Sequence, residues 1–190
     1  MTQAYFEDKT YNNVSFQEIE FPIAEYENCK FLNCDFSEVD LSEFKFTDCE
    51  FEGCNLSLVK LYKTAFRDVV FRNCKMLGLH FDTCYEFGLS FNFENCTLNH
   101  STFYKTKIKK IKFKNTQLLE VDFTECNLSE AVFDNSDLSR ATFDDTNLEK
   151  ADFRTAYNYS INPEINRIKK ARFSIQGVSG LLEKYDISIV

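Results

Sequence analysis

Large apolar side chains recur at every fifth residue along most of the chain. The first run is unbroken over sixteen positions: Phe6, Tyr11, Phe16, Phe21, Tyr26, Phe31, Phe36, Leu41, Phe46, Phe51, Leu56, Leu61, Phe66, Phe71, Met76 and Phe81. After a slip of two residues, thirteen more follow: Phe93, Leu98, Phe103, Ile108, Phe113, Leu118, Phe123, Leu128, Phe133, Leu138, Phe143, Leu148 and Phe153. Neither an α-helix, with a period of about 3.6 residues, nor a strand, with a period of about two, generates this spacing. The pattern predicts a solenoid, in which each unit buries its apolar side chains against its neighbours.

The residue two places before each large one is usually small or β-branched, as at Cys29, Thr64 and Ala131, and the other three positions are mostly polar. This pattern predicts a chain that turns a corner every five residues, so that four units close a square coil of about twenty residues. Stacked coils should pair their backbones at about 4.8 Å, the ordinary spacing between strands. Because the chain has only two Pro and five Gly, Asn, Asp, Ser and other ordinary residues must make the corners.

Two segments depart from the repeat. Between the two runs the spacing gains two residues, and Glu86 and Gly88 stand where large apolar side chains are expected. This insertion predicts a bulge or small loop near residues 83–90, at a seam between two stacks of coils. A second irregularity at residues 157–167 predicts a loop that bows outward from the last coils.

The C-terminal segment has a different periodicity. Val178, Leu181, Leu182 and Tyr185 recur at helix-like spacing, and a short apolar tail with Ile187 and Ile189 follows. We therefore expect a β-helix over residues 1–173 and a helix with an apolar tail over residues 174–190. A helix in this position would cover the open end of the solenoid.

The repeat resembles that of the pentapeptide-repeat proteins. Their loose consensus begins with a small residue, continues with Asp or Asn, and has Leu or Phe at the centre. It is met at Ser136-Asp137-Leu138, Thr146-Asn147-Leu148 and Ala151-Asp152-Phe153, and more loosely at Ala131-Val132-Phe133. The resemblance covers residues 4 to about 173, and it implies an all-β fold, a right-handed quadrilateral β-helix.

Side chains suited to catalysis or metal binding are sparse. All eight cysteines fall at the small inward position, which favours core packing over a zinc site or disulfides. The two histidines fall at outward positions, and phosphate-binding loops and nucleophile-elbow motifs are not found. We therefore expect a protein that is not an enzyme and needs no cofactor or metal. Lacking a recognisable signal peptide or membrane span, it should be cytoplasmic.

The negative charge is concentrated in the N-terminal half. Residues 1–86 hold sixteen acidic and eight basic side chains and so account for the whole net charge of −8. Acidic residues stack at coil spacing in two groups: Glu7, Asp8, Glu25, Glu27, Asp48 and Asp68, and later Asp122, Glu125, Asp144 and Asp145. Such an exterior either keeps a solenoid in solution or imitates DNA.

A lysine-rich segment interrupts this acidic exterior. Residues 105–114 carry six lysines on about two adjacent sides of one coil, while the inward Ile108 and Phe113 keep the repeat intact. The lysines either balance charge or contact phosphate or an acidic partner.

The C-terminal segment from Gly180 to Ile189 resembles the end of the Qnr-type quinolone-resistance proteins. The resemblance implies a non-enzymatic DNA mimic that binds a type II topoisomerase, DNA gyrase or topoisomerase IV, and protects it from fluoroquinolones. It also implies a homodimer through Val178, Leu181, Leu182, Tyr185, Ile187 and Ile189.

The nearly unbroken repeat is similar to that of Qnr-type members without long loops. Direct nucleic-acid binding and membrane binding are not expected. The alternative is a structural or scaffolding module with another protein partner.

Overall fold

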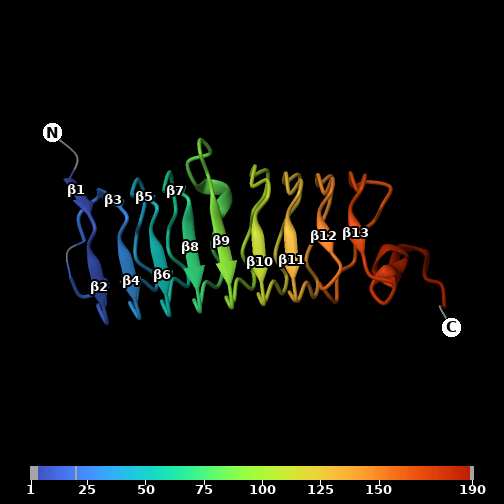
Figure 1. Ribbon diagram of the computed structural model, residues 1–190, viewed down its shortest axis with the longest axis horizontal. Coiled ribbons are helices and arrows are strands. Elements are labelled where there is room, and N and C mark those ends of the chain that lie inside the picture. The colour runs from blue at the N-terminus through green and yellow to red at the C-terminus, as the bar shows by residue number, and fades with distance from the viewer. Residues whose placement is uncertain (1–3, 20, 189–190) are drawn as a thin grey trace.

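The computed structural model describes residues 4–19 and 21–188, and shows an all-β solenoid of about eight turns (Figure 1). Each turn has four sides, which stack into four walls named A, B, C and D in chain order. In the second turn these walls are residues 24–28, 29–33, 34–38 and 39–43. The predicted all-β solenoid is therefore confirmed.

Two parallel sheets run along the solenoid. On wall A four strands pair in sequence: β1 (Ala4–Glu7), β3 (Ala24–Glu27), β5 (Lys45–Thr47) and β7 (Ala65–Arg67). Wall B has nine strands: β2 (Thr10–Asn12), β4 (Lys30–Leu32), β6 (Glu50–Glu52), β8 (Val69–Arg72), β9 (Phe91–Glu94), β10 (Lys112–Lys114), β11 (Val132–Asp134), β12 (Asp152–Phe153) and β13 (Arg172–Phe173). On walls C and D the coils meet through isolated parallel bridges, such as those between Ser15 and Asp35 and between Asp40 and Lys60.

The register follows the sequence repeat. Paired residues are twenty apart, as in Tyr11 with Phe31 and Phe113 with Phe133, so side chains of one kind stack in columns. Between β8 and β9 the offset is twenty-two, because Val69 pairs with Phe91. Two extra residues are thus accommodated without interrupting the sheet of wall B.

Each corner is made by the second residue after a large inward one. This residue has a positive φ, for example 48° at Asn28, 49° at Asn115, 66° at Glu43 and 62° at Lys110. Asn and Asp tolerate the left-handed region better than most residues, which explains their frequency at the corners. Glu, Lys and Arg occupy the same place in other coils, so the backbone conformation follows from coil closure rather than from one residue type.

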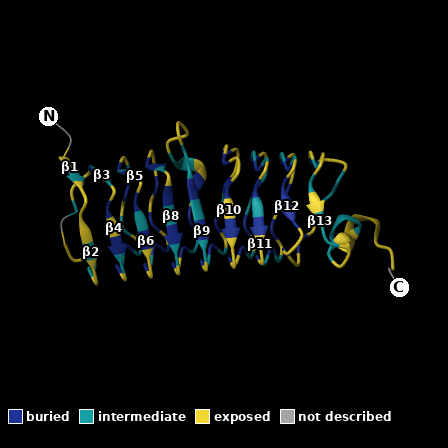
Figure 2. Ribbon diagram, in the orientation of Figure 1, coloured by how far each residue is buried: buried dark blue, intermediate teal, exposed yellow. Residues whose placement is uncertain are grey.

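The interior is a set of stacked aromatic and aliphatic columns. Buried residues recur in coil after coil along the solenoid (Figure 2). On wall B the rings lie nearly parallel, with centroids 4.6 Å apart for Phe31 and Phe51 and 5.3 Å apart for Phe71 and Phe93. Parallel coils at strand spacing place identical side chains directly over one another. Burial of these columns is the main stabilising term of the fold.

The small inward positions form hydrogen bonds between coils. The Cys74 thiol reaches the carbonyl oxygens of Phe51 and Arg72 at 3.4 and 3.1 Å, and the Thr64 hydroxyl donates to the Leu41 carbonyl at 2.7 Å. All eight cysteines are free, seven are buried, and burial raises the pKa of the Cys49 thiol to about 12. The thiols thus behave as small core side chains, and the described residues contain no cluster of His, Cys, Asp and Glu suited to a metal ion.

The seam projects from the solenoid wall as a loop, visible in green in Figure 1. It begins with a short 3₁₀ helix, η1 (Phe81–Thr83), whose Phe81 enters the core, and it rejoins the wall at β9. The second irregular segment adds no residue, because Tyr157 and Arg167 still pair with partners twenty positions earlier. Tyr159 and Ile161 are buried there, so their side chains fill space that the repeat leaves empty.

The prediction of a C-terminal helix was wrong in its type. Two 3₁₀ segments, η2 (Val178–Leu181) and η3 (Glu183–Tyr185), stand in its place, and no α-helix is found in the described part of the chain. Gly177 and Gly180 disfavour an α-helix, and both press against Tyr159, so that an added Cβ would overlap its hydroxyl or its carbonyl oxygen. The Ile161 amide also donates to the Gly180 carbonyl at 2.8 Å, which fixes the segment to the last coil.

Candidate protein-interaction surface

The first group of predicted acidic residues lies on the N-terminal half of wall A. β1, β3 and the following corners hold Glu7, Asp8, Glu25 and Glu27, and the next two corners hold Asp48 and Asp68. The pairing of Glu7 with Glu27 and the repeated corner position place five of these carboxylates in two columns, and Glu25 lies beside them in the column of Tyr5 and Lys45. We call this set the acidic column pair. The structure therefore gathers all six residues on one face.

Neighbouring groups hold some of these carboxylates in place. The Tyr5 hydroxyl donates to Glu27 at 2.7 Å, and this contact raises the pKa of Tyr5. The Asn28 amide donates to Asp8, the Ser90 hydroxyl donates to Asp68 at 2.9 Å, and Lys45 lies 3.5 Å from Glu25. Lys45 and Arg67 are the cations within β1, β3, β5 and β7, so the column pair has six acidic groups against two basic ones.

The second group of predicted acidic residues lies elsewhere. Asp122, Glu125, Asp144 and Asp145 belong to wall D in the C-terminal half. The carboxylate of Glu125 is 3.5 Å from the Lys105 ammonium and also accepts the Tyr104 hydroxyl at 3.2 Å. The two groups are thus on different walls and in different halves, and they do not form one continuous acidic surface.

Beyond the seam wall A becomes basic. The coil after the seam presents Lys107, Lys109 and Lys110 on this wall, and its last coil presents Lys169 and Lys170. The same lysine-rich segment continues onto wall B as Lys112 and Lys114 in β10. Wall A is therefore acidic in its N-terminal half and basic in its C-terminal half.

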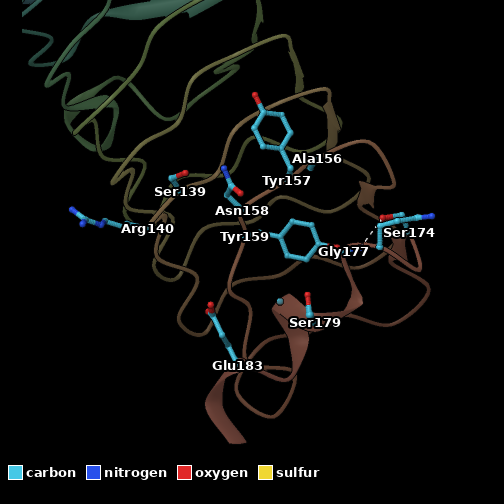
Figure 3. A pocket seen from close by; sticks show the side chains of 12 residues that line it. Ser139, Arg140, Ala156, Tyr157, Asn158, Tyr159, Ser174, Gly177, Ser179 and Glu183 are labelled. Atoms are coloured by element: carbon cyan, nitrogen blue, oxygen red, sulfur yellow. Dashed lines mark hydrogen bonds between the residues drawn. The ribbon is translucent and has the colours of Figure 1, made fainter. Parts of the chain in front are cut away.

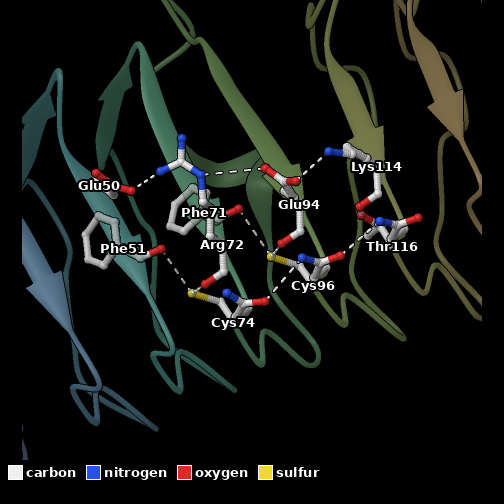
Figure 4. A network of polar contacts seen from close by, with 12 residues as sticks. Glu50, Phe51, Phe71, Arg72, Cys74, Glu94, Cys96, Lys114 and Thr116 are labelled. Atoms are coloured by element: carbon white, nitrogen blue, oxygen red, sulfur yellow. Dashed lines mark hydrogen bonds and ion pairs between the residues drawn. The ribbon is translucent and has the colours of Figure 1, made fainter.

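Wall B has alternating charges that pair with one another (Figure 4). Arg72 contacts Glu50, and its Nε lies 3.6 Å from Glu94. Lys114 donates to Glu94 at 2.6 Å, and this contact lowers the pKa of Glu94. Because these charges neutralise each other across coils, wall B is a less suitable docking surface for a charged partner than wall A.

A hollow of about 640 Å³ lies at the C-terminal end, between the last coils and η2 (Figure 3). Tyr159 points into this region, and its hydroxyl is buried without a hydrogen-bond partner among the described residues. Arg140 and Glu183 are the charged residues in the lining, and the remainder supplies hydroxyl, amide and backbone groups. Within the part of the chain that the structure describes, its lining holds no His, Cys, Asp or Lys, and Glu183 is the one carboxylate in it.

The predicted dimer residues have different environments. Val178, Tyr185 and Ile187 are 42, 49 and 57% exposed, whereas Leu181 is half-buried against the core and Leu182 is half-buried. The Tyr185 hydroxyl donates to Glu164 at 2.9 Å. Ile189 lies outside the described residues. Ile175, which the periodicity did not select, is 88% exposed beside this group.

Two aromatic residues of the seam, Tyr85 and Phe87, were not predicted from the sequence to belong to an interaction surface. Tyr85 and Phe87 are 49 and 76% exposed, and Ala65 forms the floor of a hollow beside them. The signal available in the sequence was the insertion itself, because an aromatic residue outside the five-residue register has no place in the core.

The geometry defines a four-sided parallel β-solenoid with a solid apolar interior and charged walls. Residues 28–82 match the family described as pentapeptide repeats, and residues 88–157 match the pentapeptide repeat region family. The chain belongs to the pentapeptide repeat proteins.

Solved structures extend this likeness over the whole chain. A trypsin-treated form of QnrB1, a plasmid-mediated fluoroquinolone resistance protein, superposes with a TM-score of 0.64 at 16% identity and covers 100% of both chains. A second trypsin-treated form gives a TM-score of 0.56 at 18% identity and covers 99% of this chain and 98% of that one. No curated protein matches the sequence. At these identities the likeness concerns the fold alone.

Proposed function

We propose that this protein is a non-enzymatic, cytoplasmic DNA mimic that binds a type II topoisomerase and protects it from fluoroquinolones. The observation that carries the proposal is the acidic column pair on wall A. Its six carboxylates extend over four coils, or three steps of about 4.8 Å, which is roughly 14 Å. Duplex DNA has about eight phosphate charges over that length. With Lys45 and Arg67 counted, this part of wall A has a net charge of −4, which is about half the charge density of DNA.

The C-terminal sequence resemblance to the Qnr-type proteins and the solenoid shape shared with QnrB1 add support. A DNA-binding groove on a topoisomerase is basic, and a rigid acidic wall is complementary to it. The acidic residues are supplied by stacked strands and corners, so they are pre-organised and lose little conformational entropy on binding.

The test is a DNA gyrase supercoiling assay with and without a fluoroquinolone, titrated with the purified protein. We expect supercoiling to be rescued in the presence of the drug, or inhibited at higher protein concentration without it. A titration that leaves supercoiling unchanged in both arms would contradict the proposal.

The same resemblance leads us to propose a homodimer through the C-terminal end. Its support in the fold is a group of exposed apolar side chains, Ile175, Val178 and Ile187, around the last coil. An isologous contact between two such ends would double the length of the solenoid and cover these side chains.

Replacing both Val178 and Ile187 with aspartate should convert the dimer to a monomer, because it places charges in a desolvated contact. The measurement is molar mass by light scattering. Both positions are exposed in one chain, so the variant should fold normally. Leu181 is unsuitable for this test because it packs against the core. Ile19→Asp, at a 49% exposed position near the other end, is the matched control. Equal masses for the variant and the control would exclude this interface.

A scaffolding module for a different protein is the second candidate. The observation that favours it is the mixed charge of wall A, where Lys107, Lys109 and Lys110 follow the acidic columns. A protein that imitates only DNA would not gain from these cations. Failure of the gyrase assay would move the assignment to this second class.

A further inference from the structure

Phe87 is an exception among the phenylalanines. The chain contains 21 phenylalanines, and the other twenty are buried or half-buried within the solenoid. Phe87 is 76% exposed in the turn of the seam loop, and this loop projects from the solenoid (Figure 2). Tyr85 is 49% exposed on the same loop, and the two aromatic side chains line one hollow. A contiguous exposed apolar patch of this kind marks an interaction site.

The loop is held in a defined position by the wall. The Tyr85 amide donates to the Thr64 carbonyl at 2.9 Å, and the Ser90 amide donates to the Phe66 carbonyl at 3.0 Å. These two bonds attach both ends of the loop to the coil before it. Gly88 has a φ of +74°, a left-handed conformation that strains larger residues, and it lies in ordinary contact with the Arg67 side chain. Phe87 is therefore presented on a pre-organised base, which reduces the entropic cost of binding.

A hollow of about 500 Å³ adjoins the loop and has a simple origin. Residues at one outward position of wall A pair in the order Tyr5, Glu25, Lys45 and Ala65. Ala65 has the smallest side chain in this column, so a depression opens between Lys45 and Tyr85. A second hollow of about 530 Å³ lies on the other side of Tyr85 and reaches Phe87. Together they offer space for at least one large apolar side chain.

The surroundings of the loop are basic although the protein is acidic. Lys63 and Arg67 line the first hollow, and Lys63 lies 5.1 Å from the Tyr62 ring centroid. The next coil adds Lys107, Lys109 and Lys110, and Lys107 pairs with Glu86 in the loop. In the linings of the two hollows the cations Lys45, Lys63 and Arg67 outnumber the carboxylates Glu43 and Glu86, and Lys45 also pairs with Glu25.

We propose that the seam loop and the Ala65 hollow bind an acidic segment of a partner protein that inserts a large apolar side chain. Phe87 and Tyr85 would pack against the segment, Ala65 would form the floor under its apolar side chain, and Lys63 and Arg67 would pair with its carboxylates. Asp68 of the acidic column pair adjoins the loop, but Phe87, Tyr85 and Lys63 lie outside that set. The peptide test involves no topoisomerase, so this inference is tested independently of the proposed topoisomerase binding.

The arrangement favours an acidic protein segment over a nucleic acid. The basic patch covers about three coils, which is roughly 10 Å along the solenoid. A nucleic acid strand continues its phosphates beyond such a distance and would meet Asp48 and Asp68 on one side. A short acidic segment ends within the patch, and its apolar side chain uses the hollow, which phosphates cannot fill.

The test begins with selection of a library of short random peptides on the immobilised full-length protein. We expect enrichment of peptides that combine aspartate or glutamate with an aromatic or large aliphatic residue. The enriched peptide is then synthesised, labelled and titrated by fluorescence anisotropy. Phe87→Ser and Tyr85→Ser should each weaken its binding by about tenfold or more. Tyr85 is 49% exposed and lines both hollows, so this change removes contact surface without disturbing the wall.

Matched controls separate the site from general surface effects. Tyr157→Ser removes an aromatic side chain that is 46% exposed at the far end, and Lys150→Glu reverses a charge three coils away from the loop; neither should change the affinity. Lys63→Glu should weaken binding, and the effect should diminish at high salt. Enrichment of basic peptides, no enrichment at all, or equal binding by Phe87→Ser and the wild type would overturn the proposal. Tighter binding of a single-stranded oligonucleotide or of anionic vesicles than of the peptide would also overturn it.

Discussion

Replacing Phe93 with alanine is expected to lower the free energy of unfolding by about 3–5 kcal/mol, a large share of the stability of a domain. Phe93 is 1% exposed, and its ring lies 5.3 Å from Phe71 and 5.4 Å from Phe113. It is the first wall B phenylalanine after the seam that keeps the five-residue register, so it joins the aromatic columns of the two runs. The solid interior leaves little freedom to collapse around the cavity. Chemical denaturation followed by circular dichroism measures the change.

Phe87→Ala is the matched control, because it removes the same side chain from a position that is 76% exposed. It should change the free energy of unfolding by no more than about 0.5 kcal/mol. If the two substitutions had similar effects, the column would not be continuous across the seam, and the two halves would unfold as separate units.

The sequence was sufficient to predict the walls of this fold. A repeat of five residues with one large and one small inward side chain is buried on both counts in a square coil. Because four sides of five residues make one coil, paired residues are twenty apart. The corner role of Asn and Asp also followed, because Asn28 and Asn115 adopt positive φ at the expected place. These features are local and repeat many times, so single exceptions do not obscure them.

The exceptions could not be predicted in the same way. The spacing of Val178, Leu181 and Leu182 indicates a helix, but it does not reveal that Gly177 and Gly180 lie against Tyr159, which is about twenty residues earlier. The contact between them decides the 3₁₀ conformation. Likewise, the two-residue insertion locates the seam, but the exposure of Phe87 depends on how the loop is attached to Thr64 and Phe66. Both outcomes depend on contacts between neighbouring coils rather than on local periodicity.

Coil spacing predicts which acidic residues share a wall, and it also places the two predicted acidic groups on different walls. Stacking at coil spacing placed Glu7, Glu27 and Asp48 on one wall, because residues twenty apart share a face. The same rule assigns Asp122 and Asp144 to wall D, away from the first group. The sequence also did not reveal that the acidic wall ends at a projecting loop. A partner on wall A therefore meets two chemically different regions in succession.

Reversing the charge of Glu27, Asp48 and Asp68 together is expected to abolish gyrase inhibition or protection, or to raise the required protein concentration at least tenfold. The triple lysine variant places three cations where the proposed mimic presents anions to a basic groove. Glu25 is left unchanged because it lies 3.5 Å from Lys45. Lysine is tolerated at the corner positions 48 and 68, since Lys63 and Lys110 have the same positive φ. The measurement is the supercoiling titration with and without a fluoroquinolone.

The control variant carries lysine at Glu18, Glu38 and Glu52, which are exposed on walls C and B. Both variants gain six units of positive charge, from −8 to −2, so they share any effect of net charge on solubility or long-range steering. A loss of activity in the wall A variant alone would locate the topoisomerase contact on the acidic column pair. Equal activity of the two variants and the wild type would remove the electrostatic basis of the mimic. Equal loss in both would mean that net charge, rather than the geometry of one wall, attracts the enzyme.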